Sequence, residues 1–113
     1  MQEAVRSDFW ASALIRRAEV GGANAVIARK GDPSAGAVLV KVARLDGTGV
    51  LYAPALGPDG ARIWLNLERQ GVGPAERDID AYIERRVASD PDLWVVEIED
   101  RQGRHFLTEP TES

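Results

Sequence analysis

The chain has 113 residues and a mass of 12.3 kDa, which predicts a single domain with an ordinary hydrophobic core. Hydrophobic residues make up 44% and charged residues 28% of it, which excludes global disorder, and no apolar run is long enough to span a membrane. The net charge of −4 disfavours binding to nucleic acid or anionic lipid, and the absence of cysteine excludes disulfides and thiolate zinc sites.

The first predicted element is an amphipathic helix over residues 9–20. Ser7 or Asp8 can cap its N-terminus, and Gly21-Gly22 supplies a stop. A helical wheel gathers one apolar face, made of Trp10, Ala11, Leu14, Ile15 and Ala18. We expect residues 1–6 to form a flexible N-terminus, because they precede this helix and carry no signal-peptide pattern.

Three apolar runs follow, at residues 24–30, 36–45 and 48–54. Residues 31–35 and the dipeptide Asp46-Gly47 separate them with turn residues. A two-residue loop at Asp46-Gly47 pairs Lys41 with Tyr52, and a five-residue loop at 31–35 pairs Val26 with Val40. Both registers place Val26 and Val40 on the same face, so we predict a three-stranded antiparallel meander.

The second half of the chain predicts a strand at 61–67, a helix at 74–88, a strand at 93–99 and a short strand at 105–107. The fold class is therefore α+β, with an antiparallel sheet of five to six strands in the order helix, four strands, helix, one or two strands. We expect both amphipathic helices on one face of the sheet. The domain spans residues 7–107, and residues 108–113 form a frayed C-terminal tail.

Five segments carry a family resemblance: FWASALIRR at 9–17, RKGDP at 29–33, GAVLVK at 36–41, DPDLWVVEIED at 90–100 and GRHFL at 103–107. They resemble a small family of alphaproteobacterial proteins known as domain-of-unknown-function family 1491. The resemblance implies a free-standing small domain in the bacterial cytoplasm. It brings no activity, cofactor or catalytic residue with it.

No motif in the chain predicts catalysis or a metal site. His105 is the single histidine, and we interpret it as a strand-end residue that makes one hydrogen bond. The acidic residues between 90 and 100 lack the spacing of a calcium loop, and no serine lies in a nucleophile elbow. We therefore assign no catalytic, cofactor or metal residue.

A cationic group is the first candidate surface. In the predicted registers, Arg29 and Lys41 share a face beside Tyr52, and Arg16 overhangs from the first helix. Such a cluster can bind a phosphate or a carboxylate. The alternative is that Lys41 lies over Tyr52 and pairs with a surface carboxylate.

The same predicted face is also unusually apolar, with Ile27, Leu39 and Tyr52 among its residues. A sheet face exposed only to water would alternate with polar side chains, so we expect this one to contact a second copy or a protein partner. The favoured function is a cytoplasmic protein-interaction or regulatory module without catalytic activity. The alternative is a small-anion-binding domain, or a small enzyme, that uses the cationic group.

Overall fold

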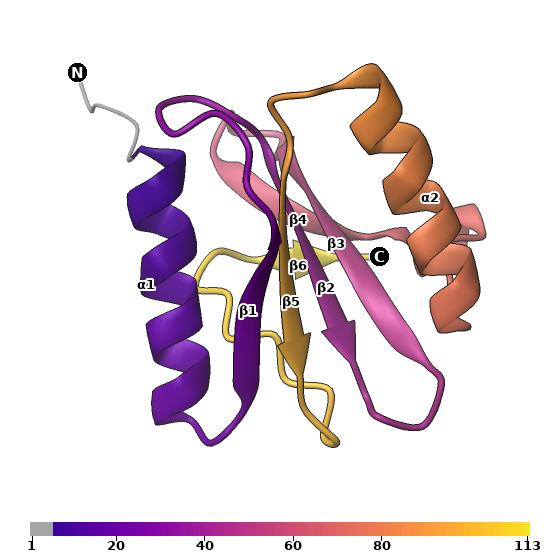
Figure 1. Ribbon diagram of the computed structural model, residues 1–113. Helices are drawn as coiled ribbons and strands as arrows, with labels where there is room; N and C mark the ends of the chain where they lie inside the picture. The colour runs from indigo at the N-terminus through magenta and orange to yellow at the C-terminus, as the bar shows by residue number, and fades with distance from the viewer. Residues whose placement is uncertain (1–5) are drawn as a thin grey trace.

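The structure is a computed structural model that describes residues 6–113. A six-stranded sheet separates two helices, α1 (Ser7–Val20) and α2 (Glu76–Ser89), which pack on opposite faces (Figure 1). The predicted α+β class is confirmed. Residues 1–5 of the expected flexible N-terminus lie outside the described residues. Within the described residues, neither helix is long and apolar enough to cross a lipid bilayer.

The helix α1 forms where the apolar spacing predicts it. Ala11, Leu14 and Ala18 are fully buried at three- and four-residue intervals, and Gly21 ends the helix. The predicted cap is wrong, because the N-cap residue is Arg6 and no side chain caps the helix. The Ser7 hydroxyl instead donates a hydrogen bond of 2.5 Å to the carbonyl oxygen of Gly36, which ties the first turn to the loop before β2.

The sheet consists of β1 (Asn24–Arg29), β2 (Val38–Ala43), β3 (Gly49–Leu56), β4 (Arg62–Asn66), β5 (Trp94–Glu99) and β6 (Thr111–Glu112). Their order across the sheet is β1-β5-β2-β3-β4-β6. The strand β5 lies between β1 and β2, antiparallel to the first and parallel to the second. The predicted antiparallel meander is therefore wrong at its first step, and the sheet is mixed.

The loop between β1 and β2 crosses over the start of β5 instead of closing a hairpin. The amide of Asp32 donates to the carbonyl of Asp92 over 3.0 Å, and the indole of Trp94 donates to the carbonyl of Asp32 over 2.6 Å. Gly31 and Gly36 make the crossing possible, because a Cβ at either position would lie about 2 Å from the Asp92 carbonyl oxygen.

The register between β2 and β3 differs from the predicted one by one residue. Lys41 lies opposite Leu51, and Val40 lies opposite Tyr52. The connection is a three-residue turn, in which Leu45 and Gly47 have positive φ angles and the Arg44 amide donates to the Thr48 carbonyl. A shift of one residue moves Tyr52 to the opposite face of the sheet from Lys41.

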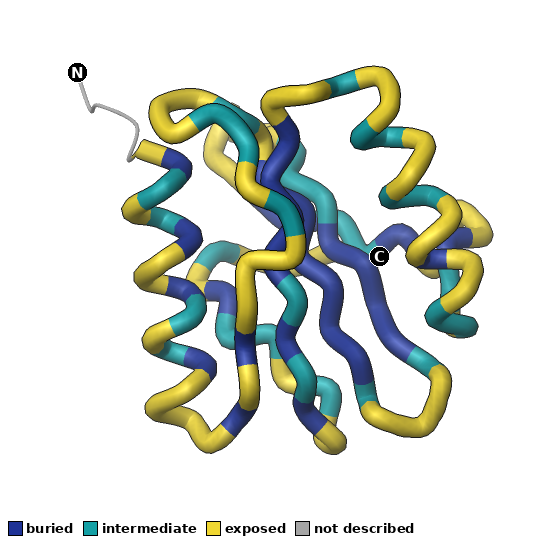
Figure 2. The backbone as a smooth tube through the Cα atoms, viewed as in Figure 1, coloured by how far each residue is buried: buried dark blue, intermediate teal, exposed yellow. Residues whose placement is uncertain are grey.

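Each face of the sheet has its own buried core (Figure 2). The core on the α1 face consists of two tryptophans and a set of aliphatic residues. Its members include Trp64, Trp94, Val38, Val40, Val42, Val96 and Ile98. The α2 face buries Leu39, Leu51, Leu67, Val72, Ile79 and Leu93. The expectation that both helices share one face is wrong, because both faces of β2 and β3 are apolar and each needs a helix.

The C-terminal segment is more ordered than expected. Residues 105–107 form no strand, and Phe106 has a positive φ of 59°. Residues 111–112 form β6, which pairs in parallel with β4, and the expected frayed tail is wrong here. Two hydrogen bonds from Trp64 hold this segment against β4. The indole N–H donates over 3.0 Å to the carboxylate of Glu109, and the backbone amide of Trp64 donates to the carbonyl of Pro110.

Candidate functional site

The strand β1 forms one open edge of the sheet. Its residues pair with β5, and within residues 6–113 no other backbone group bonds to its outer side. Val26 is 58% exposed and Ile27 is 41% exposed, and the two side chains point to opposite faces of the strand. In Figure 2, most of this strand, at the front of the view, is coloured as exposed. The edge therefore offers unpaired hydrogen-bonding groups flanked by apolar side chains.

Open edge strands in proteins are usually shortened, charged or covered, because they otherwise pair with other chains. The opposite edge follows this rule, since β6 has two residues. The edge strand β1 has six residues, and only a bulge after Ile27 and the cations Arg29 and Lys30 interrupt its apolar run. Its protection is thus confined to its C-terminal end.

A groove of about 600 Å³ lies beside β1 on the α2 face, and we call it the β1 groove. It exists because α2 packs over β3, so that β1 and β5 extend beyond the helix. Its apolar lining residues are Ala28, Ile83, Val87, Ala88 and Val95, and its charged ones are Arg29, Lys41, Asp80, Glu84 and Glu97. It combines an apolar floor with an excess of carboxylates.

Lys41 lies at the inner end of this groove with only 5% of its side chain exposed. Its ammonium nitrogen is 2.8 Å from the Oδ1 of Asp80, 2.9 Å from the Oε1 of Glu76 and 3.9 Å from the Oε1 of Glu97. Burial alone lowers the pKa of Lys41, but the hydrogen bonds to Asp80 and Glu76 outweigh it and leave that pKa raised. The ammonium is therefore already neutralised, and a small anion here would meet three carboxylates.

Arg29 shares the groove with Lys41, as the sequence predicts, but it binds the protein itself. Its Nη2 donates to the carbonyl oxygen of Pro91 over 3.2 Å. Its buried Nε has no hydrogen-bond partner among the described residues. Burial in the groove raises the pKa of Glu97, and the nearby charge of Lys41 offsets part of that rise.

The other predicted site residues do not join these two. Tyr52 faces α1 and contacts the ring of His105 edge-on, at 5.1 Å between centroids. Leu39 is completely buried in the core beneath α2, and Arg16 lines a separate groove on α1. Of the apolar face expected to contact a partner, Leu39 and Tyr52 are buried within the protein itself, and Ile27 remains exposed.

His105 makes one hydrogen bond, as expected, but it does not lie at the end of a strand. Its Nδ1 accepts one hydrogen bond of 2.9 Å from the backbone amide of Leu107. Burial lowers the pKa of its imidazole, which favours the neutral form. Across residues 6–113 there is no cluster of side chains that could hold a metal ion.

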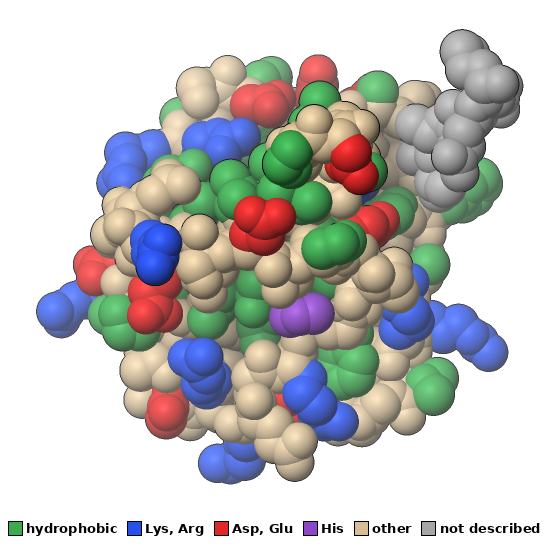
Figure 3. Space-filling model, turned by 180° about the vertical axis from the view of Figure 1, so that it is seen from behind, with side chains coloured by type: hydrophobic (Ala, Val, Ile, Leu, Met, Phe, Trp, Pro, Cys, Tyr) green, Lys and Arg blue, Asp and Glu red, His purple; other side chains and the backbone are tan. Residues whose placement is uncertain are grey.

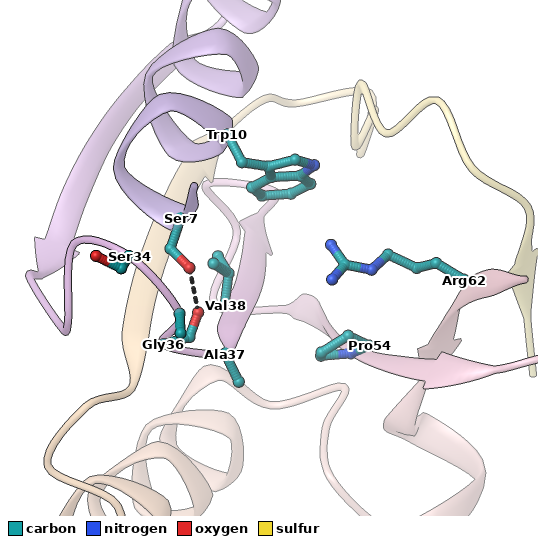
Figure 4. Close-up of a pocket in the computed structure, with 9 residues that line it drawn as sticks. Ser7, Trp10, Ser34, Gly36, Ala37, Val38, Pro54 and Arg62 are labelled. Carbon is teal, nitrogen blue, oxygen red and sulfur yellow. Dashed lines mark hydrogen bonds between the residues drawn. The ribbon is translucent and has the colours of Figure 1, made fainter. Parts of the chain in front are cut away.

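A second cavity of about 310 Å³ lies where the start of α1 meets β3 and β4 (Figure 4). Figure 4 shows Arg62 reaching toward the space between Trp10 and Pro54, with the Ser7 hydroxyl bonded to Gly36. Arg62 also lies 5.8 Å from the centre of the Trp64 ring. Among the described residues, Arg62 is the one charged group in the lining, so the cavity has no acid–base pair for catalysis.

The sequence reasoning missed Val26, Glu84 and Glu97 as surface candidates. The predicted hairpin registers pair Val26 with Val40 and so place Val26 on the inward face of the sheet. The insertion of β5, which leaves β1 at the edge, has no local signal. Seen from behind, Lys and Arg side chains are interspersed with carboxylates and form no single positive patch (Figure 3).

A family model described as "Protein of unknown function (DUF1491)" matches residues 5–108. The chain belongs to the DUF1491 family. The family model covers both the β1 edge and the β1 groove, so these features lie inside the DUF1491 domain. No functionally curated protein matches the chain.

Three solved structures share the DUF1491 fold seen here. A crystal structure of a DUF1491 protein from Caulobacter crescentus is 57% identical, with a TM-score of 0.87, over 96% of this chain and 99% of that one. An NMR structure of a DUF1491 protein from the same organism is 57% identical, with a TM-score of 0.85, over 99% and 100%. The solution structure of protein Atu0922 from A. tumefaciens is 32% identical, with a TM-score of 0.76, over 95% of each chain.

Proposed function

We propose that this protein is a cytoplasmic protein-interaction module that binds an extended segment of a partner protein along β1. The observation that carries the proposal is the open, apolar edge of that strand. An added strand satisfies the unpaired backbone groups, which supplies affinity that does not depend on sequence. It also covers the exposed side chains of Val26 and Ile27. The opposite edge of the sheet offers no strand of similar length, because β6 has only two residues.

The geometry favours this function over the binding of a small anion at the predicted cationic group. Lys41 is already neutralised by Asp80 and Glu76, and Arg29 donates to a backbone carbonyl. An anion would have to displace carboxylates that belong to the same fold. The predicted pairing of Lys41 with a carboxylate is the alternative that the contacts support.

The test is to purify partners from a lysate of Caulobacter crescentus with this protein as bait, and to map the contact by hydrogen exchange. We expect a bound protein that slows exchange of the β1 amides. Val26→Lys places a charge on the edge and should abolish retention of that protein. Leu56→Lys is the matched control, because Leu56 is exposed at the end of β3, which lies three places away from β1 in the sheet.

Two results would overturn the proposal. The first is a bound protein that leaves exchange of the β1 amides unchanged, or whose retention survives Val26→Lys. The second is a dimer of this protein that Val26→Lys dissociates, because a second copy then occupies the edge. Light scattering of both variants detects that dimer.

A further inference from the structure

We infer that the partner segment carries an arginine or lysine at the position that pairs with Val26, and that this cation enters the β1 groove toward Glu97. The inference rests on the proposed function, since it requires a strand on β1. It adds a chemical requirement for the partner. A bare sheet edge accepts any extended chain, whereas a charged groove beside it selects among them.

The register of the sheet places Glu97 within reach of the added strand. Val26 pairs with Glu97, which in turn pairs with Lys41, so these three side chains form one row on the α2 face. A partner residue opposite Val26 extends the same row. It lies about 10 Å from Glu97, two strand spacings away, which an arginine and a glutamate side chain can span together. Val26 supplies an apolar surface beneath the stem of the cation.

The charges of the groove are complementary to a cation. Asp80 and Glu76 hold Lys41 closely, while Glu97 stands at 3.9 Å and Glu84 has no ion pair among the described residues. The lining holds three carboxylates against two cations, Arg29 included, so it keeps carboxylate charge that the protein's own cations do not neutralise. Glu97 is also only 27% exposed, so a cation placed there is screened less by water than one on an open surface.

The neighbouring row points to an apolar residue next to this cation. Ile27 pairs with Val96 on the α1 face, where the surroundings are aliphatic. Successive residues of an added strand alternate between the two faces. The expected partner segment thus reads as a basic residue flanked by apolar ones. A second copy of β1 centred on Val26 offers valine in place of the cation, so charge complementarity favours a different protein.

The test uses two nine-residue peptides in which Thr and Val alternate, with either Arg or Gln replacing the central Thr. Each is titrated into the isotope-labelled full chain while NMR follows the amide shifts of residues 24–29. We expect both peptides to shift these amides and the Arg peptide to bind about three- to five-fold more tightly, the range of a partly exposed ion pair. Glu97→Gln should remove the preference, and Glu112→Gln on β6 should retain it.

The possible failures are distinguishable. Equal affinity of the two peptides for the wild-type chain overturns the inference and leaves strand addition at β1 intact. A preference for Arg that survives Glu97→Gln also overturns it, because the cation then does not interact with Glu97. If neither peptide shifts the β1 amides at millimolar concentration, the edge does not accept a strand and the proposed function fails as well.

Discussion

The two faces of the sheet bury their cores in different ways. The core on the α1 face is apolar and contains both fully buried tryptophans, Trp64 and Trp94. The α2 face has a smaller aliphatic core and, beside it, the buried ammonium of Lys41 surrounded by carboxylates. Stability is therefore concentrated on the α1 face, while the α2 face combines packing with an ionic contact that opens onto the β1 groove.

This difference shows how a small domain separates stability from binding. Apolar packing tolerates few substitutions, because each buried atom is in contact on all sides. A charged cluster at a groove contributes little net stability, since the removal of charges from water offsets their attraction. Substitution of a carboxylate near Lys41 can therefore change a binding preference while it costs the fold little stability. Five measurements test this contrast.

The largest effect is expected on the α1 face, for Trp94→Ala. Trp94 is about 1% exposed, and its indole donates to the Asp32 carbonyl that anchors the loop crossing over β5. Loss of this side chain should lower the free energy of unfolding by about 3–5 kcal/mol. Urea denaturation measures it, and a loss below about 1 kcal/mol would contradict the core position of Trp94.

On the α2 face, Leu39→Ala should have the next largest effect. Leu39 is fully buried beneath α2, and its truncation should cost about 2–4 kcal/mol, in the range for buried leucines. The same denaturation series provides the comparison. A cost equal to or above that of Trp94→Ala would reverse the assignment of the main core to the α1 face.

A smaller effect is expected for Lys41→Met, which keeps the stem and removes the charge. The carboxylates of Glu76, Asp80 and Glu97 remain partly exposed, so their repulsion is screened and the cost at pH 7 should be about 1 kcal/mol. The cost should shrink at acidic pH, because burial raises the pKa of Glu97 and its carboxylate loses its charge there. A cost that does not change with pH would mean that packing, and not charge, is the contribution of Lys41.

At alkaline pH, the free energy of unfolding should depend on the α2 face through Lys41. The pKa of Lys41 is raised above its ordinary value of 10.5, so its contribution is complete below that pH and is lost as the pH rises through the folded-state value. Lys41→Met should flatten the unfolding free energy in that range. A wild-type slope that the variant retains would contradict this assignment.

The smallest effect is expected on the α1 face at mildly acidic pH. Burial lowers the pKa of His105 below its ordinary value of 6.5, so the unfolded chain binds the proton more readily. Its contribution is complete above pH 6.5 and is lost as the pH falls through the folded-state pKa. His105→Gln should reduce this slope, measured by denaturation at several pH values. If the pH dependence of the unfolding free energy is unchanged in His105→Gln, it comes from the carboxylates and not from His105.

Local patterns in the sequence were sufficient for most of the secondary structure. The spacing of Ala11, Leu14 and Ala18 predicts α1. The alternation of Trp94, Val96 and Ile98 with Val95, Glu97 and Glu99 predicts the strand β5, but Val95, which this alternation places outward, is buried. These signals are local, because the helical and strand periods are set by a few consecutive residues. The predicted hairpin registers placed Arg29 and Lys41 on one face of adjacent strands; both side chains line the β1 groove, but β5 lies between their strands.

Only the tertiary structure decided the order of the strands, and with it the candidate site. The loop of residues 30–37 is long enough either to close a hairpin or to pass over one strand, since the second span is only about 10 Å. The late strand β5 fills that gap through contacts with distant residues, such as the bond from Trp94 to Asp32, 62 positions earlier. Its insertion leaves β1 at the edge and exposes Val26. Strand order depends on which distant segments bury the most apolar surface together, and the spacing of apolar residues within one segment does not determine this.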